Sequence, residues 1–324
     1  MHLHLTNYYF MKNQLIGTNR ENNIVLLGAQ GPSVFFYGFA FLREDSYVGN
    51  PCYQYYNLLV KDSVFETLKT MFDFVSIQVD ETKKTVLLAY LRGYLNAYSL
   101  SRNTQPYVYY FGGYEVSNSP WDKHSLNRYS LETKLDILYE QSIRESTPFK
   151  QIFRVAKDDV LAISEMFYHL AIDVYSLPNI TKRTYYNAYS SMKTRLSILN
   201  GESVAFSRTI LSMMNKNHVN VFIRSNRVEH TDKYDFLNLR KRIWKHPSEG
   251  VELDITFLDL INEVKDETLL INAILRDFTA GKDITKQLKH YSMNLNYLGL
   301  PIDRDPIYFD VIFKENENGT ESHY

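Results

Sequence analysis

Hydrophobic and polar residues follow two different patterns along this chain, and the change comes near residue 120. In 22–44, two apolar runs are separated by the segment GAQGP, which is typical of two strands joined by a turn. In 62–76, apolar residues recur three and four positions apart, so this stretch predicts a helix. The apolar run 85–100 fits either a buried helix or two strands. The stretch 105–116, rich in Tyr and Val and interrupted by Gly-Gly, predicts a strand.

After residue 120 the helical period dominates. The clearest example begins with acidic residues in its first turn and is followed by Pro178, which are the usual signals of a helix start and stop. The next helix has Asn179 or Thr181 as its cap and ends before Asn200 and Gly201. Helices are predicted at 130–145, 157–178, 181–199, 203–216 and 257–278, and strands at 218–224, 251–257 and 306–313.

These patterns predict an α+β protein, with a mixed N-terminal part that contains short strands and a helix-dominated C-terminal part with a small antiparallel sheet. A chain of 324 residues can form one large or two medium domains. The change of pattern places a boundary within 117–125. We therefore expect a mixed α/β domain at 1–120 and a mainly helical, basic domain at 121–324, of which 314–324 is a polar tail.

Composition narrows the class of protein. A hydrophobic content of 44% with 23% charged residues is ordinary for a folded chain. The single cysteine, Cys52, excludes an intramolecular disulfide and a zinc site built from several cysteines. No apolar run reaches the length of a membrane span, and the first ten residues lack the pattern of a signal peptide. The expected location is the cytoplasm, of a cell or of an infected host cell.

Charge is distributed unevenly along the sequence. The formal net charge is −1, but 181–246 contains 13 Lys and Arg against four Asp and Glu, a net charge of +9. The following segment, 247–282, has eight acids and three bases, which reverses the sign to −5. Basic residues with aromatic residues between them can neutralise phosphates and stack on unpaired bases. Alternatively, the basic and acidic segments pair with each other in the fold.

The basic segment also resembles part of a helix-turn-helix. The helix predicted at 157–178 would support a recognition helix at 181–199, whose N-terminal Lys182 and Arg183 would meet phosphates and base edges. The nucleic-acid contacts expected over 181–246 are Lys182, Arg183, Tyr185, Tyr186, Lys193, Arg195, Arg224, Arg227, Arg240, Lys241, Arg242 and Trp244.

Two Arg/His pairs with equal spacing lie in the same segment, Arg224 with His230 and Arg240 with His246. An imidazole can take a proton from a 2′-hydroxyl while a guanidinium stabilises the charge on the phosphorane. The spacing is similar to the Arg-x4-6-His signature of HEPN-type ribonucleases, and this resemblance implies a metal-independent ribonuclease. Ser225 and Lys241 stand where those enzymes often have Asn beside the Arg.

Other signals of site chemistry are weaker. His2 and His4 would share one face of a strand, as in some metal sites, but no further ligand motif follows. The GAQGPS segment is not a phosphate-binding loop, because no Lys-Ser or Lys-Thr follows it. Nothing near Cys52 identifies a catalytic base, and Asp254 lacks the second acid of a metal nuclease. No metal and no cofactor are expected.

The charge pattern therefore favours a non-enzymatic, cytoplasmic protein that binds DNA or RNA, such as a regulator or a replication or defence factor of a phage or other mobile element. The alternative is a protein-interaction or structural component, such as a virion part or an inhibitor of a host complex. Its many tyrosines would form the interface with a protein partner or a second copy. A ribonuclease that uses the Arg/His pairs is the third hypothesis.

Overall fold

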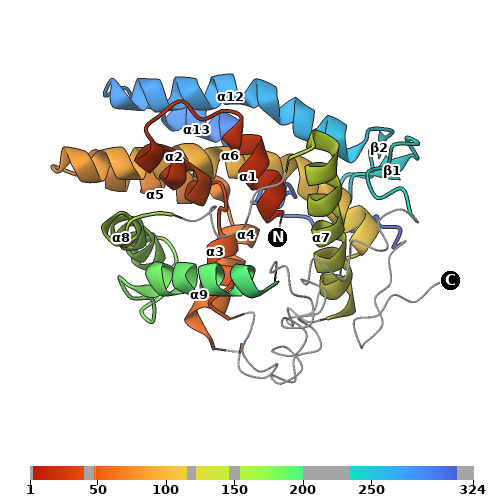
Figure 1. Ribbon diagram of the computed structural model, residues 1–324, viewed down its shortest axis with the longest axis horizontal. Helices are drawn as coiled ribbons and strands as arrows, with labels where there is room; N and C mark the ends of the chain where they lie inside the picture. Colours follow the sequence, from red (N-terminus) through yellow and green to blue (C-terminus); the bar gives the residue numbers. More distant parts are fainter. Residues whose placement is uncertain are drawn as a thin grey trace.

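The computed structural model describes residues 3–39, 47, 49–114, 122–145, 154–199 and 234–311. Helices dominate these ranges, together with a two-stranded antiparallel sheet, as expected for the C-terminal part (Figure 1). The elements are α1 (His4–Lys12), α2 (Asn19–Gly28), α3 (Ser33–Phe36), α4 (Pro51–Lys61), α5 (Val64–Ser76), α6 (Glu81–Gly112), α7 (Lys123–Ile143), α8 (Lys157–Asp173), α9 (Thr184–Leu199), β1 (Trp244–Lys245), β2 (Glu252–Leu253), α12 (Phe257–Thr279) and α13 (Thr285–Ser292).

The 32-residue helix α6 is the centre of the fold. Asp80 caps its N-terminus by accepting hydrogen bonds from the backbone N–H groups of Thr82 and Lys83. Helices α2, α7, α8 and α12 all pack against it, so it is buried on several sides. This burial explains why the run 85–100 lacks a clear polar face. The helix continues through Pro106, and the strand predicted at 105–116 is therefore wrong over 105–112.

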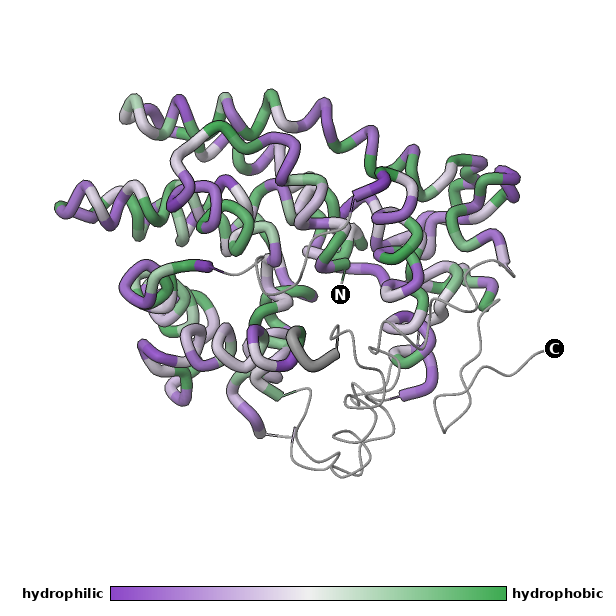
Figure 2. Tube along the Cα trace, in the orientation of Figure 1, coloured by the Kyte–Doolittle hydropathy of each residue, from purple (hydrophilic) through white to green (hydrophobic). Residues whose placement is uncertain are grey.

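The strands predicted in 22–44 are also wrong where the structure describes them. The first apolar run is helix α2, which begins at a capping box in which Thr18 and Glu21 exchange side-chain to backbone hydrogen bonds. The second run forms the short helix α3 and the turns after it, and Phe35 and Phe36 are buried. Much of this stretch is coloured as hydrophobic in Figure 2. The C-terminal half of α2 and all of α3 are buried, and a continuous apolar run does not distinguish a buried helix from a buried strand.

The sheet is smaller than the predicted one. Trp244 pairs with Leu253 and Lys245 with Glu252, so β1 and β2 form a hairpin. Only two residues of the predicted strand 251–257 are in this sheet, and the described part of 306–313 contains no strand. That segment runs beside the hairpin, where the backbone N–H groups of Ile307 and Tyr308 donate to the carbonyl of Pro247. The predictions at 203–216 and 218–224 lie outside the described residues.

Tyrosines build the core instead of a surface. The Tyr185 ring stacks on Phe167 at 4.8 Å with an interplanar angle of 7°, and its hydroxyl donates to the hydroxyl of Tyr90. Such buried rings place a hydroxyl within reach of a polar partner while their apolar area stabilises the fold. Sixteen tyrosines of the described ranges are buried: Tyr8, Tyr9, Tyr37, Tyr55, Tyr56, Tyr90, Tyr94, Tyr98, Tyr107, Tyr109, Tyr129, Tyr139, Tyr185, Tyr189, Tyr291 and Tyr297. An extensive tyrosine-rich interface, as expected from composition, is therefore not formed by these residues.

Helix α1 is held by α7 through carboxylates. The buried Asp136 of α7 accepts hydrogen bonds from the backbone N–H groups of Leu5 and Thr6 and from the Thr6 hydroxyl. One turn further along α7, Glu140 accepts from the hydroxyl of Tyr9. Asp136 therefore does for the first turn of α1 what an N-cap side chain usually does within its own helix.

Candidate functional site: a cleft between α5, α12 and α13

The structure separates the residues expected to contact nucleic acid near α9. Lys182 and Arg183 are exposed in the turn before this helix, and Lys182 Nζ lies 3.1 Å from the Glu165 carboxylate of α8. Tyr185 is buried in the core, so its ring presents no face on which a base could stack. Tyr186 is half-buried, and its backbone N–H donates to the Ser164 hydroxyl. These contacts show that α8 and α9 pack together. Of the four side chains, however, Lys182 is paired with a carboxylate and Tyr185 is buried in the core.

Further along α9 the two predicted cations have different surroundings. Lys193 is exposed and lies over the Tyr189 ring. Arg195 is half-buried, and desolvation lowers the pKa of its guanidinium to about 10, although the nearby Tyr37 partly opposes this effect. A guanidinium held inside the protein in this way is poorly placed to contact a phosphate chain.

The second group lies around the hairpin. Arg240 and Lys241 are exposed, and Arg242 forms an ion pair with Asp310. Trp244 is buried, and its indole N–H donates to the carbonyl of Ile255. Tyr185 and Trp244 are thus corrections to the predicted set, because both rings belong to the core. Arg224 and Arg227 lie outside the described residues.

The two groups do not converge among the described residues. Helix α9 and the hairpin of β1 and β2 lie at opposite sides of the molecule (Figure 1). Downstream carboxylates also pair with part of the basic segment, as in the contact between Lys245 and Glu252 at 3.2 Å. The described part of 181–246 is therefore a partly neutralised surface in two places. It is not one electropositive face.

The other sequence candidates are located as follows. The first Arg/His pair, Arg224 with His230, lies outside the described residues. In the second, Arg240 is exposed while His246 is half-buried at the hairpin turn, where burial lowers its pKa. His4 is buried, bonded to Gln30 and Tyr37, and burial lowers its pKa to about 4. No cluster of three or more His, Cys, Asp or Glu suited to a metal occurs in the described ranges.

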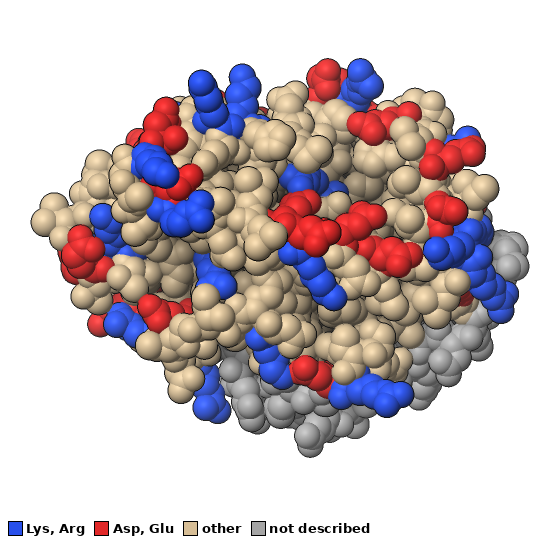
Figure 3. Space-filling view, turned by 90° about the horizontal axis from the view of Figure 1, so that it is seen from above, with Lys and Arg blue, Asp and Glu red and all other residues tan. Residues whose placement is uncertain are grey.

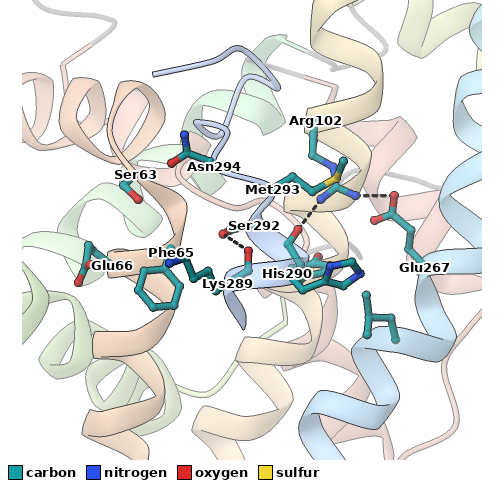
Figure 4. Close-up of a pocket in the computed structure, with 12 residues that line it drawn as sticks. Ser63, Phe65, Glu66, Arg102, Glu267, Lys289, His290, Ser292, Met293 and Asn294 are labelled. Carbon is teal, nitrogen blue, oxygen red and sulfur yellow. Dashed lines mark hydrogen bonds and ion pairs between the residues drawn. The ribbon is translucent and has the colours of Figure 1, made fainter. Parts of the chain in front are cut away.

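A cleft of about 1040 Å³ opens between α5, α12 and α13, over the C-terminal half of α6 (Figure 4). This volume is at the upper end of the range that small-molecule sites occupy. Its walls combine charged, polar and apolar side chains from parts of the chain that are distant in sequence. The lining residues are Ser63, Phe65, Glu66, Arg102, Glu267, Leu270, Lys289, His290, Tyr291, Ser292, Met293 and Asn294.

Side chains of α6 fix the end of α13 at the bottom of this cleft. The last carbonyl groups of a helix have no partner within it. Here the carbonyl of Tyr291 accepts from Arg102 Nη1 at 2.6 Å, and the carbonyl of Ser292 accepts from the Tyr98 hydroxyl at 2.7 Å. Burial raises the pKa of Tyr98 to about 12, which keeps this hydroxyl protonated and able to donate. The geometry of the cleft floor is therefore set by α6.

The chain leaves α13 through two residues in the left-handed region, Met293 with φ of 53° and Asn294 with φ of 55°. Asn tolerates this conformation, but Met adopts it at a cost of roughly 1–2 kcal/mol. The hydrogen bonds from Tyr98 and Arg102 hold the backbone immediately before this turn. The consequence is that Met293, 60% exposed, is placed on the wall of the cleft.

An ion pair between the buried Arg102 and the half-buried Glu267 lies on the α12 side. Arg102 Nη2 is 2.5 Å from Glu267 Oε1, and the guanidinium also lies over the rings of Tyr98 and Tyr291. Desolvation opposes the charge on Arg102, but Glu267 and the two tyrosines together raise its pKa. Asn103 donates to the same oxygen, Oε1, at 3.3 Å. The other oxygen, Oε2, is buried and accepts no hydrogen bond from the described residues.

The opposite wall offers an aromatic ring and a cation. Phe65 of α5 is half-buried, and the Lys289 side chain extends toward it from α13 (Figure 4). Lys289 is exposed and forms no ion pair with a carboxylate in the described ranges. The cleft thus joins a flat apolar surface and an available positive charge.

The surface around α12 carries both signs of charge. From above, carboxylates and cations alternate over this side of the molecule (Figure 3). The segment 247–282 that contains α12 has a net charge of −5. A long polyanion would therefore be repelled here, whereas a ligand with one anionic group could use Lys289.

No local sequence pattern indicates this cleft. Its residues are spread from position 63 to position 294, and none belongs to a motif. Comparisons with protein-family models, with curated proteins and with solved structures find no match to this chain. None of the helices in the described ranges combines the length and apolar character needed to cross a bilayer.

Proposed function

We propose that this protein is a binding protein for a mononucleotide, with its site in the cleft between α5, α12 and α13. The observation that carries the proposal is the combination found in this one cleft. Phe65 and Met293 supply an apolar surface for a base, and Lys289 supplies a cation for a phosphate. The mixed charge around α12 favours a single nucleotide over a long strand.

Binding of guanosine monophosphate should weaken about tenfold when Lys289 is replaced by Met. This is the loss expected for a charge-assisted contact of roughly 1.4 kcal/mol that is partly exposed to solvent. Isothermal titration calorimetry at low salt measures the affinity directly. Lys286→Met is the matched control, because Lys286 is also exposed on α13 but does not line the cleft. Equal weakening by both substitutions, or no binding at millimolar nucleotide, would contradict the proposal.

Nucleic-acid binding by 181–246 is a second candidate. It is supported by the +9 charge of this segment and by the exposure of Arg183, Arg240 and Lys241. Such binding would depend on phosphate neutralisation at separate points, because the described cations lie in two groups. The buried rings of Tyr185 and Trp244 take no part in it.

For this second candidate, Arg240→Ala should weaken binding to single-stranded RNA and to duplex DNA alike. The slope of log affinity against log salt should fall by about 1, as expected for one lost phosphate contact. Fluorescence anisotropy between about 50 and 200 mM salt gives this slope. Tyr185→Phe serves as the control and should leave it unchanged. Absence of binding at the lowest salt would remove the candidate.

A further inference from the structure

The methionines of the described ranges differ sharply in exposure. Met293, which follows α13, is 60% exposed, whereas the other four lie in helices and are at most 1% exposed: Met11, Met71, Met166 and Met192. A thioether is oxidised most readily where a peroxide can reach its sulfur. Of these five methionines, the fold therefore leaves one accessible to an oxidant, and that one lines the cleft.

The backbone immediately before Met293 fixes where its side chain lies. Arg102 and Tyr98 donate to the carbonyl groups of the two preceding residues, Tyr291 and Ser292. The φ of Met293 is 53°, in the left-handed region that residues other than Gly, Asn and Asp rarely adopt. Residues that the surrounding structure holds in such conformations are concentrated at ligand sites and switches. A chemical change in this side chain therefore alters the cleft wall and leaves the core packing intact.

We propose that Met293 is an oxidation site that controls ligand binding in the cleft. Hydrogen peroxide transfers one oxygen atom to the thioether sulfur, so that the O–O bond breaks, the sulfur becomes a sulfoxide and the peroxide is reduced to water. The sulfoxide is polar, and it replaces part of the apolar surface that Met293 and Phe65 provide. A methionine sulfoxide reductase reverses the step with two electrons and two protons from a dithiol, and releases water.

The effect on binding rests on the proposed nucleotide function, whereas the selective oxidation of Met293 does not. Cys52, the single cysteine, is the other sulfur that peroxide could attack. It is half-buried, and burial raises the pKa of its thiol to about 11, so little of the reactive thiolate is present near neutral pH. Cys52 lies in α4 and does not line the cleft. Its oxidation therefore leaves the cleft wall unchanged.

Limited treatment of the native protein with hydrogen peroxide, followed by peptide mass spectrometry, measures the sulfoxide at each methionine. Met293 should be oxidised at least about tenfold faster than Met71 and Met166, because a buried sulfur reacts only when the fold opens around it. In concentrated urea this difference should disappear. Equal rates in the native protein would overturn the proposal.

Calorimetry with guanosine monophosphate, before and after the same treatment, measures the effect on the cleft. The affinity of the wild-type protein should fall about fivefold, as expected when part of an apolar contact is lost. In Met293→Leu the ratio of the two affinities should be about one, because leucine has no sulfur to oxidise. Met71→Leu is the matched control and should remain as sensitive as the wild type, since Met71 is buried and does not line the cleft. Methionine sulfoxide reductases with dithiothreitol should restore the wild-type affinity.

Sulfoxide at Met293 without a loss of affinity, or a loss that persists in Met293→Leu, would overturn the control of binding by this residue. Absence of nucleotide binding by the untreated protein would instead overturn the proposed function, and with it the effect of oxidation on binding. Mass spectrometry of the same samples still decides whether Met293 is the selectively oxidised methionine.

Discussion

Gly93→Ala is expected to reduce the free energy of unfolding by about 3 kcal/mol or more, which is a large effect for one added methyl group. A Cβ atom at Gly93 would lie 2.0 Å from the carbonyl oxygen of Val25 and 2.7 Å from the backbone nitrogen of Ala29. Both are backbone atoms of α2 or its C-terminal turn, which cannot move aside as a flexible side chain does. Helices α2 and α6 would have to separate along their contact.

The direction of this change is a strong test, because the intrinsic helix propensities of Gly and Ala predict a change in the opposite direction. Within a helix, Ala is favoured over Gly by about 1 kcal/mol, so an uncrowded position would gain stability. Gly281→Ala is a suitable control. No atom lies within 4 Å of its added Cβ, and the cost should be only the roughly 1 kcal/mol of a left-handed Ala at φ of 74°. Urea unfolding of both variants measures the difference. A Gly93→Ala protein as stable as the wild type would show that α2 and α6 do not meet as described.

The same contact shows what the sequence could and could not predict. Helices α5, α8 and α12 have a polar side facing solvent, and their apolar spacing predicted them. The apolar runs of α2 and α6 lie in the parts of these helices that are buried on several sides, so they show no helical period. One signal for α2 was present and overlooked. Thr18 and Glu21 have the spacing of a capping box, which marks a helix start even where the following residues are uniformly apolar.

The strand predicted at 105–116 was wrong for a different reason, because its Tyr and Val content belongs to the end of α6, which continues through Pro106. Proline has no N–H for the carbonyl four residues earlier, and this usually ends a helix. In α6 that carbonyl belongs to Arg102, and the turn at Gly299 lies against it, with a φ of 72° that suits glycine. This packing between residues almost 200 positions apart has no local sequence signal.

The candidate site illustrates the same limit at the level of function. The basic segment was visible because charge can be counted, yet counting does not reveal which cations pair with Glu165, Glu252 or Asp310. The cleft was invisible because its lining residues are spread from position 63 to position 294. They meet only after α6 has fixed the end of α13 and Arg102 has paired with Glu267 of α12. Burial and pairing are properties of the fold, and they decide which charged residues can meet a ligand.

Asp136→Ala should be the second severe substitution, with a loss of about 4 kcal/mol in the free energy of unfolding. The carboxylate accepts from two backbone N–H groups at the start of α1 and from the Thr6 hydroxyl, and both Asp136 and Thr6 are buried. Alanine would leave these donors inside the protein without this acceptor, at roughly 1–3 kcal/mol for each unsatisfied group. Asp136→Asn retains one acceptor oxygen, so its loss should be about half as large.

Asp80→Ala is the control that distinguishes the effect of burial on the free energy of unfolding from the effect of helix capping alone. Asp80 also accepts from two backbone N–H groups at a helix start, those of Thr82 and Lys83, but its helix end is exposed to water. Water can replace that acceptor, so the loss should be about 1 kcal/mol, as for an ordinary N-cap. Chemical denaturation of the three variants gives the comparison. A severalfold larger loss of unfolding free energy in Asp136→Ala than in Asp80→Ala is expected, because the Asp136 carboxylate contacts α1 away from water. Equal losses in the two variants would mean that the N-terminus of α1 is solvated and is not anchored on α7.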